Sequence, residues 1–321
     1  MGDRKQGLYD VDIERRISGL EIEPLTEKNI DLIVSFVDEL YVQGIGVHRI
    51  LKYISTLKCI FIKLDKDFEN VTERDLKSYV GGLERSKLSA WSKHDYKVVL
   101  RIVYKWQFGE ELAWVKTKIP RNKRKLPTEL LDETDIDIMV DQASNARDRA
   151  FVSLLWDIGP RIGEIATMLV GSVYFDSLGA MVYVSGKTGP RKVRTVYSVK
   201  YLQDWVQKHP MKDDPNAPLW VNLRPHDGEY IQMDYYSIRK QLKNIAKRAG
   251  IRKKVNPQQF RHSRATYMAH HMTPSQMCAY FGWVTESDMP GVYVHISGTD
   301  LDDVIFRANG VQKKSNVKKE K

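Results

Sequence analysis

Cysteine is scarce in this sequence, and long apolar runs are missing. The two cysteines, Cys59 and Cys278, are too few and too far apart to suggest a disulfide framework, which indicates a reducing, intracellular setting. No apolar run approaches the roughly 20 residues that a membrane-spanning helix needs. The first residues lack the hydrophobic region of a signal peptide. We therefore expect a cytoplasmic protein with no membrane partner.

Motifs that bind nucleotides or metals are missing as well. The sequence has no GxxxxGK[ST] phosphate loop, no GxGxxG dinucleotide motif and no acidic cluster of the kind that holds two metal ions. His270, His271 and Cys278 lack the spacing of a zinc site. We therefore predict chemistry that needs no ATP, no metal and no cofactor.

Basic residues outnumber acidic ones. The 321 residues include 51 Lys and Arg against 41 Asp and Glu, a formal net charge of +10. Such an excess favours a polyanionic partner, because lysine and arginine that neutralise phosphates release counterions. Basic proteins are common, however, so charge alone leaves the partner open.

The first part of the chain is predicted to be helical. After a polar lead-in at residues 1–24, apolar residues recur with helical spacing over residues 29–42 and 47–64. Thr72 and Asp75 form a capping pattern for a third helix that ends near residue 86. A fourth helix is predicted over residues 89–108. These helices define an expected domain at residues 25–115.

Two basic features belong to this region. Four basic residues recur every fourth position of the last predicted helix and so share one face: Lys93, Lys97, Arg101 and Lys105. Like charges at this spacing cost helix stability, which favours phosphate binding over a solvated face. A basic segment with two prolines follows at residues 116–127, and we interpret it as an interdomain linker that lies along DNA or is merely solvated. Its candidate contacts are Arg121, Lys123, Arg124 and Lys125.

The second part combines helices with a small sheet. Helices are predicted at 135–143 (with Thr134 as N-cap), 147–158, 161–169, 200–208, 234–249, 257–271 and 274–280, with a short one around Tyr293. Strands are predicted at 172–175, 181–185 and 193–199, with a turn of three or more residues in GKTGPRK between the last two. The expected fold class is mainly α with a small antiparallel β-sheet (α+β), with a domain at residues 128–307 and a lysine-rich tail at 308–321.

Some residues of this part have the chemistry to attack a phosphodiester. Guanidinium groups stabilise the charge that grows in the transition state, because each presents two parallel donors. Phosphoryl transfer otherwise needs positioning, a nucleophile and an acid for the leaving oxygen, and a tyrosine can be the nucleophile. The candidates are Arg161 in GPRIGE, Arg261 in QQFRHSRAT and Tyr293 in YVH.

These motifs and the GKTGPRK hairpin, in this order, resemble the signatures of the tyrosine recombinases (phage integrase family), and among them the archaeal integrases and Xer-like members. The resemblance covers nearly the whole chain. It implies a SAM-like core-binding domain at residues 25–115, a catalytic domain at 128–307, and a site-specific recombinase that cuts and rejoins DNA through a 3′-phosphotyrosyl intermediate. It also implies double-stranded DNA as partner, a homotetramer on two DNA sites that is a monomer without DNA, and a nucleoid-associated place in a prokaryote.

The resemblance assigns roles to single residues. Arg161 and Arg261 match the two catalytic arginines, and Glu164 matches a supporting acidic residue. Lys187 matches the hairpin lysine that protonates the leaving 5′ oxygen. Tyr293 matches the nucleophile. The plainer alternatives are an ordinary helical ion pair for the first arginine and a solvated basic turn for the lysine.

Other positions match less closely. His262 matches the histidine after the second arginine, and Trp283 stands where many members have histidine, with a core tryptophan as the alternative. Gln258 replaces the usual histidine, and glutamine cannot accept a proton at neutral pH. Arg191 in the hairpin is a further DNA-binding candidate.

Two other functions stay open at this point. A type IB topoisomerase-like nicking and rejoining enzyme shares the same chemistry, and Gln258 leaves room for a catalytically inactive DNA-binding relative. Tyr267 and Tyr280 are the alternative nucleophiles, although we expect both in the core.

Overall fold

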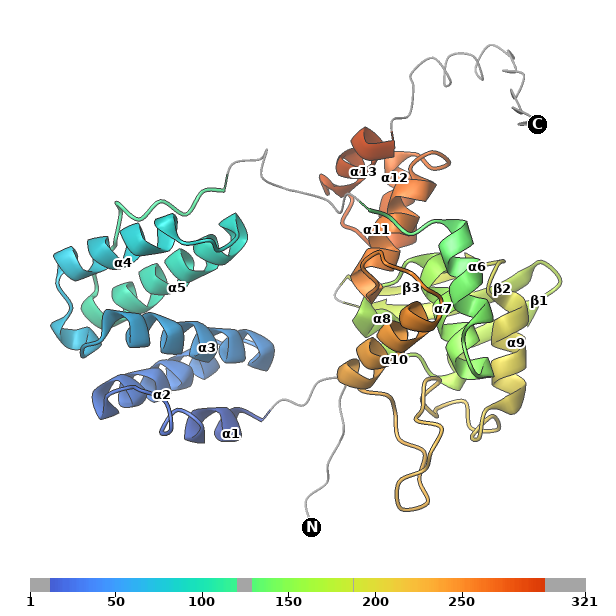
Figure 1. Cartoon of the computed structure of the whole chain (residues 1–321), viewed down its shortest axis with the longest axis horizontal. Coiled ribbons are helices and arrows are strands. Elements are labelled where there is room, and N and C mark those ends of the chain that lie inside the picture. Colours follow the sequence, from blue (N-terminus) through green and yellow to red (C-terminus); the bar gives the residue numbers. More distant parts are fainter. Residues whose placement is uncertain (1–11, 120–128, 187, 298–321) are drawn as a thin grey trace. The chain divides into compact units, whose positions relative to one another are not determined.

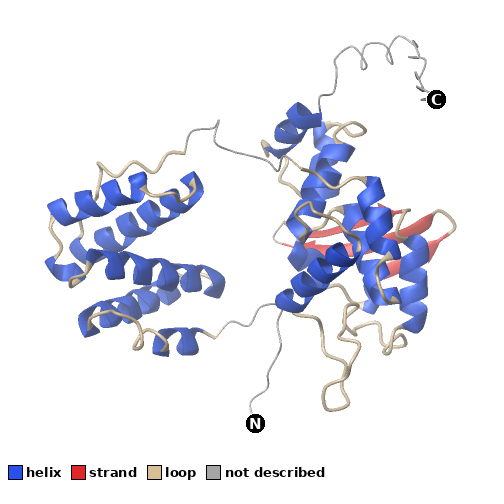
Figure 2. Ribbon diagram, viewed as in Figure 1, coloured by secondary structure: helices blue, strands red, loops and turns tan. Residues whose placement is uncertain are grey.

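The computed structural model describes residues 12–119, 129–186 and 188–297. The chain divides into two compact units, one of Asp10–Lys125 and one that contains Leu126–Lys321. Each unit has its own apolar core. The described part of the first unit is helical, and the strands lie in the second (Figure 2). No helix of the described residues is long and apolar enough to cross a membrane.

The first unit is a stack of amphipathic helices around one core (Figure 1). Their apolar faces supply residues such as Phe36, Ile54 and Leu100, all nearly fully buried. The predicted capping box is confirmed, since Asp75 N donates to Thr72 Oγ1 at 3.3 Å and Thr72 N donates to Asp75 Oδ2 at 2.9 Å. The elements are α1 (Ile13–Ser18), α2 (Glu27–Val42), α3 (Val47–Leu64), η1 (Phe68–Asn70), α4 (Glu73–Arg85) and α5 (Ala90–Phe108).

Helix α1 differs from the polar lead-in that the sequence predicts for residues 1–24. Asp12 caps it by accepting from Arg15 N at 2.9 Å, and Leu20 just after it is only 1% exposed. A helix of this length spans too few turns to show a period in the sequence. The packing of Ile13, Ile17 and Leu20 on the first core stabilises it instead.

The second unit is built around α7, which is buried at every position except Arg149. It packs against α6, α9, α11 and the third strand. The helices are α6 (Glu133–Asp141), α7 (Ala146–Ile158), α8 (Ile162–Ala166), α9 (Val199–Lys208), α10 (Tyr235–Arg248), α11 (Pro257–Met268), α12 (Pro274–Phe281) and α13 (Met289–Ser297). A short η3 (Val170–Ser172) precedes the sheet.

The sheet has the antiparallel order β1–β2–β3, formed by β1 (Val173–Asp176), β2 (Gly179–Gly186) and β3 (Gly189–Thr195). The register pairs Gly186 with Gly189, so the turn is tighter than predicted and β3 starts earlier. It also ends earlier, because buried Asp157 accepts from the amides of Val196 and Ser198 at 3.0 Å each. These amides are therefore not available to a continuing strand.

Several predicted helix ends are wrong, and α8 ends at Ala166 rather than at Leu169. Helix α6 is capped by Asp132 and not by Thr134, because the Asp132 carboxylate accepts from Asp135 N at 3.0 Å in a capping box. Helix α11 ends at Met268, before His271. Helices α11, α12 and α13 then pack on one another around a small separate core that contains Tyr293 (Figure 1).

Candidate active site

The C-terminal end of α12 gathers three arginine side chains. Arg191, Arg261 and Arg161 donate to the consecutive carbonyls of residues 280–282, at 3.0, 2.7 and 2.9 Å. Such carbonyls lack partners within their helix and form the partly negative end of the helix dipole. They therefore hold the guanidinium groups in place and offset the repulsion among them.

Gly282 makes this arrangement fit. Its φ of 60° is left-handed and ends α12, a conformation that glycine adopts without steric cost. A Cβ at this position would lie 2.8 Å from Arg191 Nη1. The close approach of backbone and guanidinium therefore requires glycine here.

Glu164 joins two of the arginines from the buried side. Its Oε1 accepts from Arg161 Nη1 at 2.8 Å and its Oε2 from Arg191 Nη2 at 2.9 Å, and its side chain is only 1% exposed. Burial raises the pKa of Glu164, but the hydrogen bonds from Arg191 and Arg161 outweigh it and leave the pKa below its ordinary value. Glu164 is therefore an ionised bridge that fixes both guanidinium groups.

Arg191 faces the protein interior, whereas the sequence predicts it as a DNA contact. Its side chain is 11% exposed and faces inward with Val193, because alternate residues of a strand face the same side. Lys192 faces outward, with its Nζ 5.2 Å from the centre of the Tyr183 ring. The alternation of inward and outward positions along GPRKVRT predicts that these two basic residues face opposite sides of the sheet.

Arg261 is almost fully enclosed. It is 4% exposed, and its Nη1 donates to the carbonyl of Gly159 at 3.0 Å. Its guanidinium carbon lies 5.4 Å from the ring centres of both Phe281 and Trp283. Burial and the nearby Arg161 charge lower its pKa to about 10, so it stays charged at neutral pH.

Tyr293 is buried beside Trp283 and His262. It is 1% exposed, and its ring stacks on Trp283 with centres 5.5 Å apart and planes 5° from parallel. Its hydroxyl lies 2.6 Å from His262 Nδ1. Burial raises the pKa of Tyr293 to about 12, although the Arg261 charge opposes this rise. The phenol is therefore protonated at neutral pH and needs a proton acceptor before it can attack.

The two alternative tyrosines lie differently. Tyr280 donates its hydroxyl hydrogen to the carbonyl of Asp157 at 2.6 Å and has a structural role. Tyr267 is 37% exposed on α11, whereas the sequence places it in the core. Gln258, one turn before His262, has its Nε2 3.1 Å from His262 Nε2.

Lys187 lies outside the described residues. Its neighbour Thr188 donates its hydroxyl hydrogen to the carbonyl of Gly282 at 3.0 Å, the same carbonyl that accepts from Arg161. The tip of the β2–β3 hairpin is therefore tied to the end of α12.

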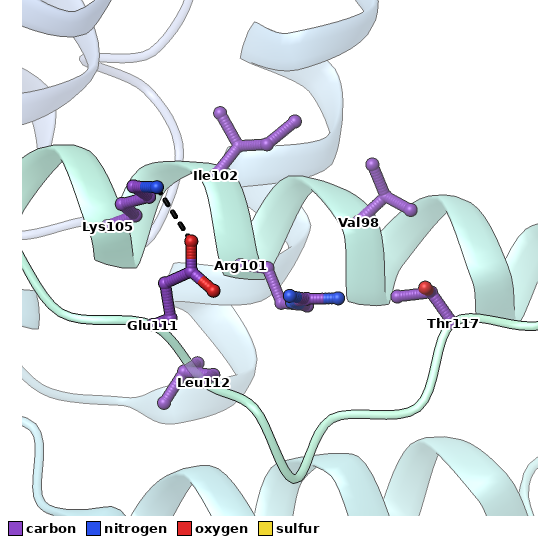
Figure 3. A pocket seen from close by; sticks show the side chains of 7 residues that line it. All are labelled: Val98, Arg101, Ile102, Lys105, Glu111, Leu112 and Thr117. Carbon is purple, nitrogen blue, oxygen red and sulfur yellow. Dashed lines mark hydrogen bonds and ion pairs between the residues drawn. The ribbon is translucent and has the colours of Figure 1, made fainter.

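The basic face of α5 is partly neutralised. Lys97 pairs with Glu84 at 2.7 Å and Lys105 with Glu111 at 2.6 Å, and Lys93 donates to the main-chain carbonyl of Glu84. Arg101 and Lys105 border a cavity of about 180 Å³ between α5 and the segment after it (Figure 3). Sequence spacing predicts the shared face but not these carboxylates, which come from α4 and from residue 111.

The four linker candidates cannot be placed. They belong to the segment 120–128, which lies outside the described residues: Arg121, Lys123, Arg124 and Lys125. They stay a prediction from the sequence.

Comparison with known proteins gives a consistent picture. The model of the phage integrase family matches residues 129–299. The tyrosine recombinase XerA of Pyrococcus horikoshii is 26% identical over 244 residues, which cover 75% of this chain and 80% of that protein. The tyrosine recombinase XerD of Ralstonia nicotianae is 23% identical over 297 residues, or 86% of this chain and 93% of that protein.

Solved structures share the fold at lower identity. The XerH site-specific recombinase bound to palindromic difH substrate in a post-cleavage complex has a TM-score of 0.63 at 17% identity, and covers 92% of this chain and 94% of that one. A lambda integrase dimer bound to a COC′ core site has a TM-score of 0.62 at 15% identity, and covers 85% and 78% of the two chains.

Proposed function

This chain belongs to the phage integrase family of DNA strand-transferring tyrosine recombinases, and we propose that Tyr293 is its nucleophile. The observation that carries this proposal is the side-by-side placement of Tyr293, Trp283 and Arg261. Arg261 lies over the face of Trp283, and Tyr293 stacks on the same indole. A phosphate that binds the arginines is therefore brought next to the tyrosine.

In the first step, the Tyr293 oxygen bonds to phosphorus and the bond to the 5′ oxygen breaks. Arg161 and Arg261 stabilise the negative charge of the transition state. The Arg161 side chain is 34% exposed, so its guanidinium is open to an incoming phosphate while Glu164 holds it from behind. Lys187 donates the proton that the leaving oxygen takes up. The product is a 3′-phosphotyrosyl link and a free 5′ hydroxyl.

In the second step, the 5′ hydroxyl of another strand attacks the phosphotyrosyl link. This attack forms a new phosphodiester, passes the hydroxyl proton back to Lys187 and releases Tyr293. The energy of the first bond is kept in the link to tyrosine, so no nucleotide hydrolysis is needed. Strand exchange then requires the same site to act in several copies, and we propose a homotetramer on two DNA sites, formed from monomers at the nucleoid.

We also propose that residues 25–115 bind DNA and residues 128–307 cut it. The basic face of α5 and the linker at 116–127 supply phosphate contacts in the first unit. Lys192 on the outer face of the sheet adds one in the second, since it is exposed beside Tyr183. Affinity should therefore fall steeply between about 50 and 200 mM salt.

Covalent trapping tests the proposal. The full chain is mixed with a nicked duplex that carries a site recovered by binding selection, and denaturing gels then show whether a protein–DNA adduct forms. We expect an adduct with the wild type and none with Tyr293→Phe or Arg261→Ala. Tyr236→Phe is the matched control, because Tyr236 is 73% exposed on α10.

Binding must be measured alongside, by fluorescence anisotropy on the same duplex. An adduct that survives in Tyr293→Phe contradicts the assignment of the nucleophile. A wild type that binds its selected site tightly but never forms an adduct contradicts the strand-transfer proposal and leaves a DNA-binding protein without cleavage.

A further inference from the structure

Three side chains form a continuous hydrogen-bonded row that ends at the tyrosine hydroxyl. Gln258 and His262 lie one turn apart on α11, so they share a face. Gln258 Nε2 is 3.1 Å from His262 Nε2, and His262 Nδ1 is 2.6 Å from the Tyr293 hydroxyl. Both ring nitrogens of His262 are therefore occupied, one on each side.

A neutral imidazole restricts how this row can be protonated. One of its nitrogens donates and the other accepts. If Tyr293 donates to Nδ1, then Nε2 carries a hydrogen and needs an acceptor, which the amide oxygen of Gln258 can provide. In the structure the amide nitrogen of Gln258 faces the ring, and in that state Nδ1 carries the hydrogen and donates to the tyrosine oxygen. The two ends of a glutamine amide are interchangeable by rotation, so this residue can serve either state.

Only the first state can take a proton from the nucleophile. We propose that His262 is the proton acceptor for Tyr293 and that Gln258 is the positioning residue that keeps Nδ1 of His262 free to accept. This inference rests on Tyr293 as nucleophile. It gives a role to Gln258, because the end of its amide that faces the ring decides which nitrogen of His262 carries the hydrogen.

In the proposed first step, the proton of Tyr293 passes to His262. The Tyr293 O–H bond breaks, a bond between hydrogen and Nδ1 forms, and the tyrosine oxygen bonds to phosphorus. The resulting imidazolium donates from Nε2 to the Gln258 amide oxygen. In the second step, the imidazolium returns its proton to the Tyr293 oxygen as that oxygen leaves phosphorus. No other acid or base is consumed over the cycle.

The surroundings of His262 keep it neutral before attack. Burial and the charges of Arg261 and Lys254 lower its pKa below the ordinary value, so the imidazole is available as an acceptor at neutral pH. Burial raises the pKa of Tyr293 to about 12, whereas the pKa of His262 lies below its ordinary value, so proton transfer before attack is strongly unfavourable. The proton therefore moves while the oxygen–phosphorus bond forms, since bonding to phosphorus makes the phenol more acidic.

The test separates nucleophile activation from leaving-group protonation. The substrate is the selected nicked duplex with a 5′-bridging sulfur at the scissile phosphate. A thiolate leaves without an acid, so the lysine step does not limit the rate. Single-turnover cleavage by the full chain is then followed from pH 5 to 9, with DNA affinity measured for every variant.

We expect His262→Phe to slow cleavage about 10²–10⁴-fold on both the sulfur and the oxygen substrate, with DNA affinity unchanged. The wild-type rate should rise with pH through one inflection below 6.5, which His262→Phe lacks. His262→Asn is smaller and polar, and it should lose the inflection too, which covers the case in which the phenylalanine variant misfolds. His226→Ala is the control, because His226 lies exposed in the loop before α10.

The Gln258 variants test the tautomer. Gln258→Glu only accepts hydrogen bonds, so it should keep cleavage within a few-fold of wild type and move the inflection to higher pH. Gln258→Leu should slow cleavage about tenfold or more at unchanged affinity. A structural role for Gln258 would not move the pH profile.

Two results overturn the inference. Wild-type cleavage of the sulfur substrate by a DNA-binding His262→Phe or His262→Asn variant would show that the histidine is not the base. Equal rates and unshifted profiles for Gln258→Glu and Gln258→Leu would remove the positioning role. Either result leaves the proposed function standing as long as Tyr293→Phe forms no adduct, whereas an adduct in Tyr293→Phe contradicts the proposed function itself.

Discussion

Gly282→Ala should impair catalysis by displacing the Arg191 guanidinium, although it removes no catalytic group. Alanine destabilises the folded state at this position in two ways. A left-handed residue with a Cβ costs about 1 kcal/mol. The Cβ also lies 2.8 Å from Arg191 Nη1 and 3.2 Å from its Cζ, so the guanidinium must retreat by roughly half an ångström.

That movement strains a buried ion pair. Arg191 is held by Glu164 at 2.9 Å and by a main-chain carbonyl at 3.0 Å. Loss of such a buried pair costs about 3–5 kcal/mol, and partial displacement costs less. We expect Gly282→Ala to destabilise the second unit by about 2–3 kcal/mol in total, and to lower its melting temperature by about 4–12 °C.

Cleavage should suffer more than binding. Glu164 also holds Arg161, so a shifted Arg191 moves the phosphate-binding guanidinium, and sub-ångström misplacement of such groups slows a reaction about tenfold to a hundredfold. DNA affinity should change by less than about threefold, because most phosphate contacts lie elsewhere. Single-turnover cleavage and anisotropy on the selected duplex measure the two quantities.

Gly250→Ala is the matched control. Gly250 follows α10 with a φ of 67°, and nothing lies within 4 Å of the Cβ that alanine would add. It should therefore show the backbone cost of about 1 kcal/mol alone, with normal cleavage. Equal stability and equal cleavage in the two variants would refute the reasoning, because the contact with Arg191 would then have no consequence.

Three further predictions follow from other contacts. The folded pKa of Glu164 lies below its unfolded value, so the stability that Glu164 contributes is present above about pH 4.5 and is lost as pH falls through the folded pKa. The melting temperature of Glu164→Gln, measured between pH 3 and 6, should therefore depend less on acid than that of the wild type. Removing the carboxylates that neutralise α5, in a Glu84→Gln and Glu111→Gln double variant, should raise DNA affinity and steepen its salt dependence, and an unchanged slope would show that this face does not meet phosphate. Thr72→Ala removes the cap of α4 and should cost the first unit about 1 kcal/mol by denaturant unfolding, with cleavage by the second unit unaffected.

The sequence predicted helix bounds correctly where a single local pattern was present. Apolar spacing gave α3 its bounds, and Thr72 with Asp75 gave α4 its start, because such contacts lie within one turn of the chain. Competing local caps were harder. Thr134 and Asp132 both suit an N-cap, and the choice depends on the reciprocal bond between Asp132 and Asp135.

The site could be predicted by residue type but not by arrangement. Arg161 and Arg261 stood out in their motifs, yet the carbonyls that hold them lie 121 and 20 residues away along the chain. No spacing rule connects them, since the contacts exist only once α12 packs on α11. The inward direction of Arg191 was readable from strand alternation, but only with the correct start of β3.

Of the hydrogen-bonded row Gln258–His262–Tyr293, the sequence predicts only the first contact. The spacing of Gln258 and His262 places them on one face of a helix, whereas the contact with Tyr293 depends on the packing of α13. The sequence suggested a lost base at Gln258. The structure instead places an imidazole one turn further along, against the hydroxyl.

Identifying the DNA-linked residue tests whether Tyr293 is the nucleophile. The trapped adduct is digested with nuclease and trypsin and analysed by tandem mass spectrometry. Trypsin alone leaves residues 265–307 as one peptide, which contains Tyr267, Tyr280 and Tyr293, because no lysine or arginine interrupts it. A second digestion after Glu286 separates Tyr293 from the other two. We expect the nucleotide remnant on Tyr293, in the peptide of residues 287–307, whereas a remnant on the peptide of residues 265–286 would show that Tyr293 is not the nucleophile.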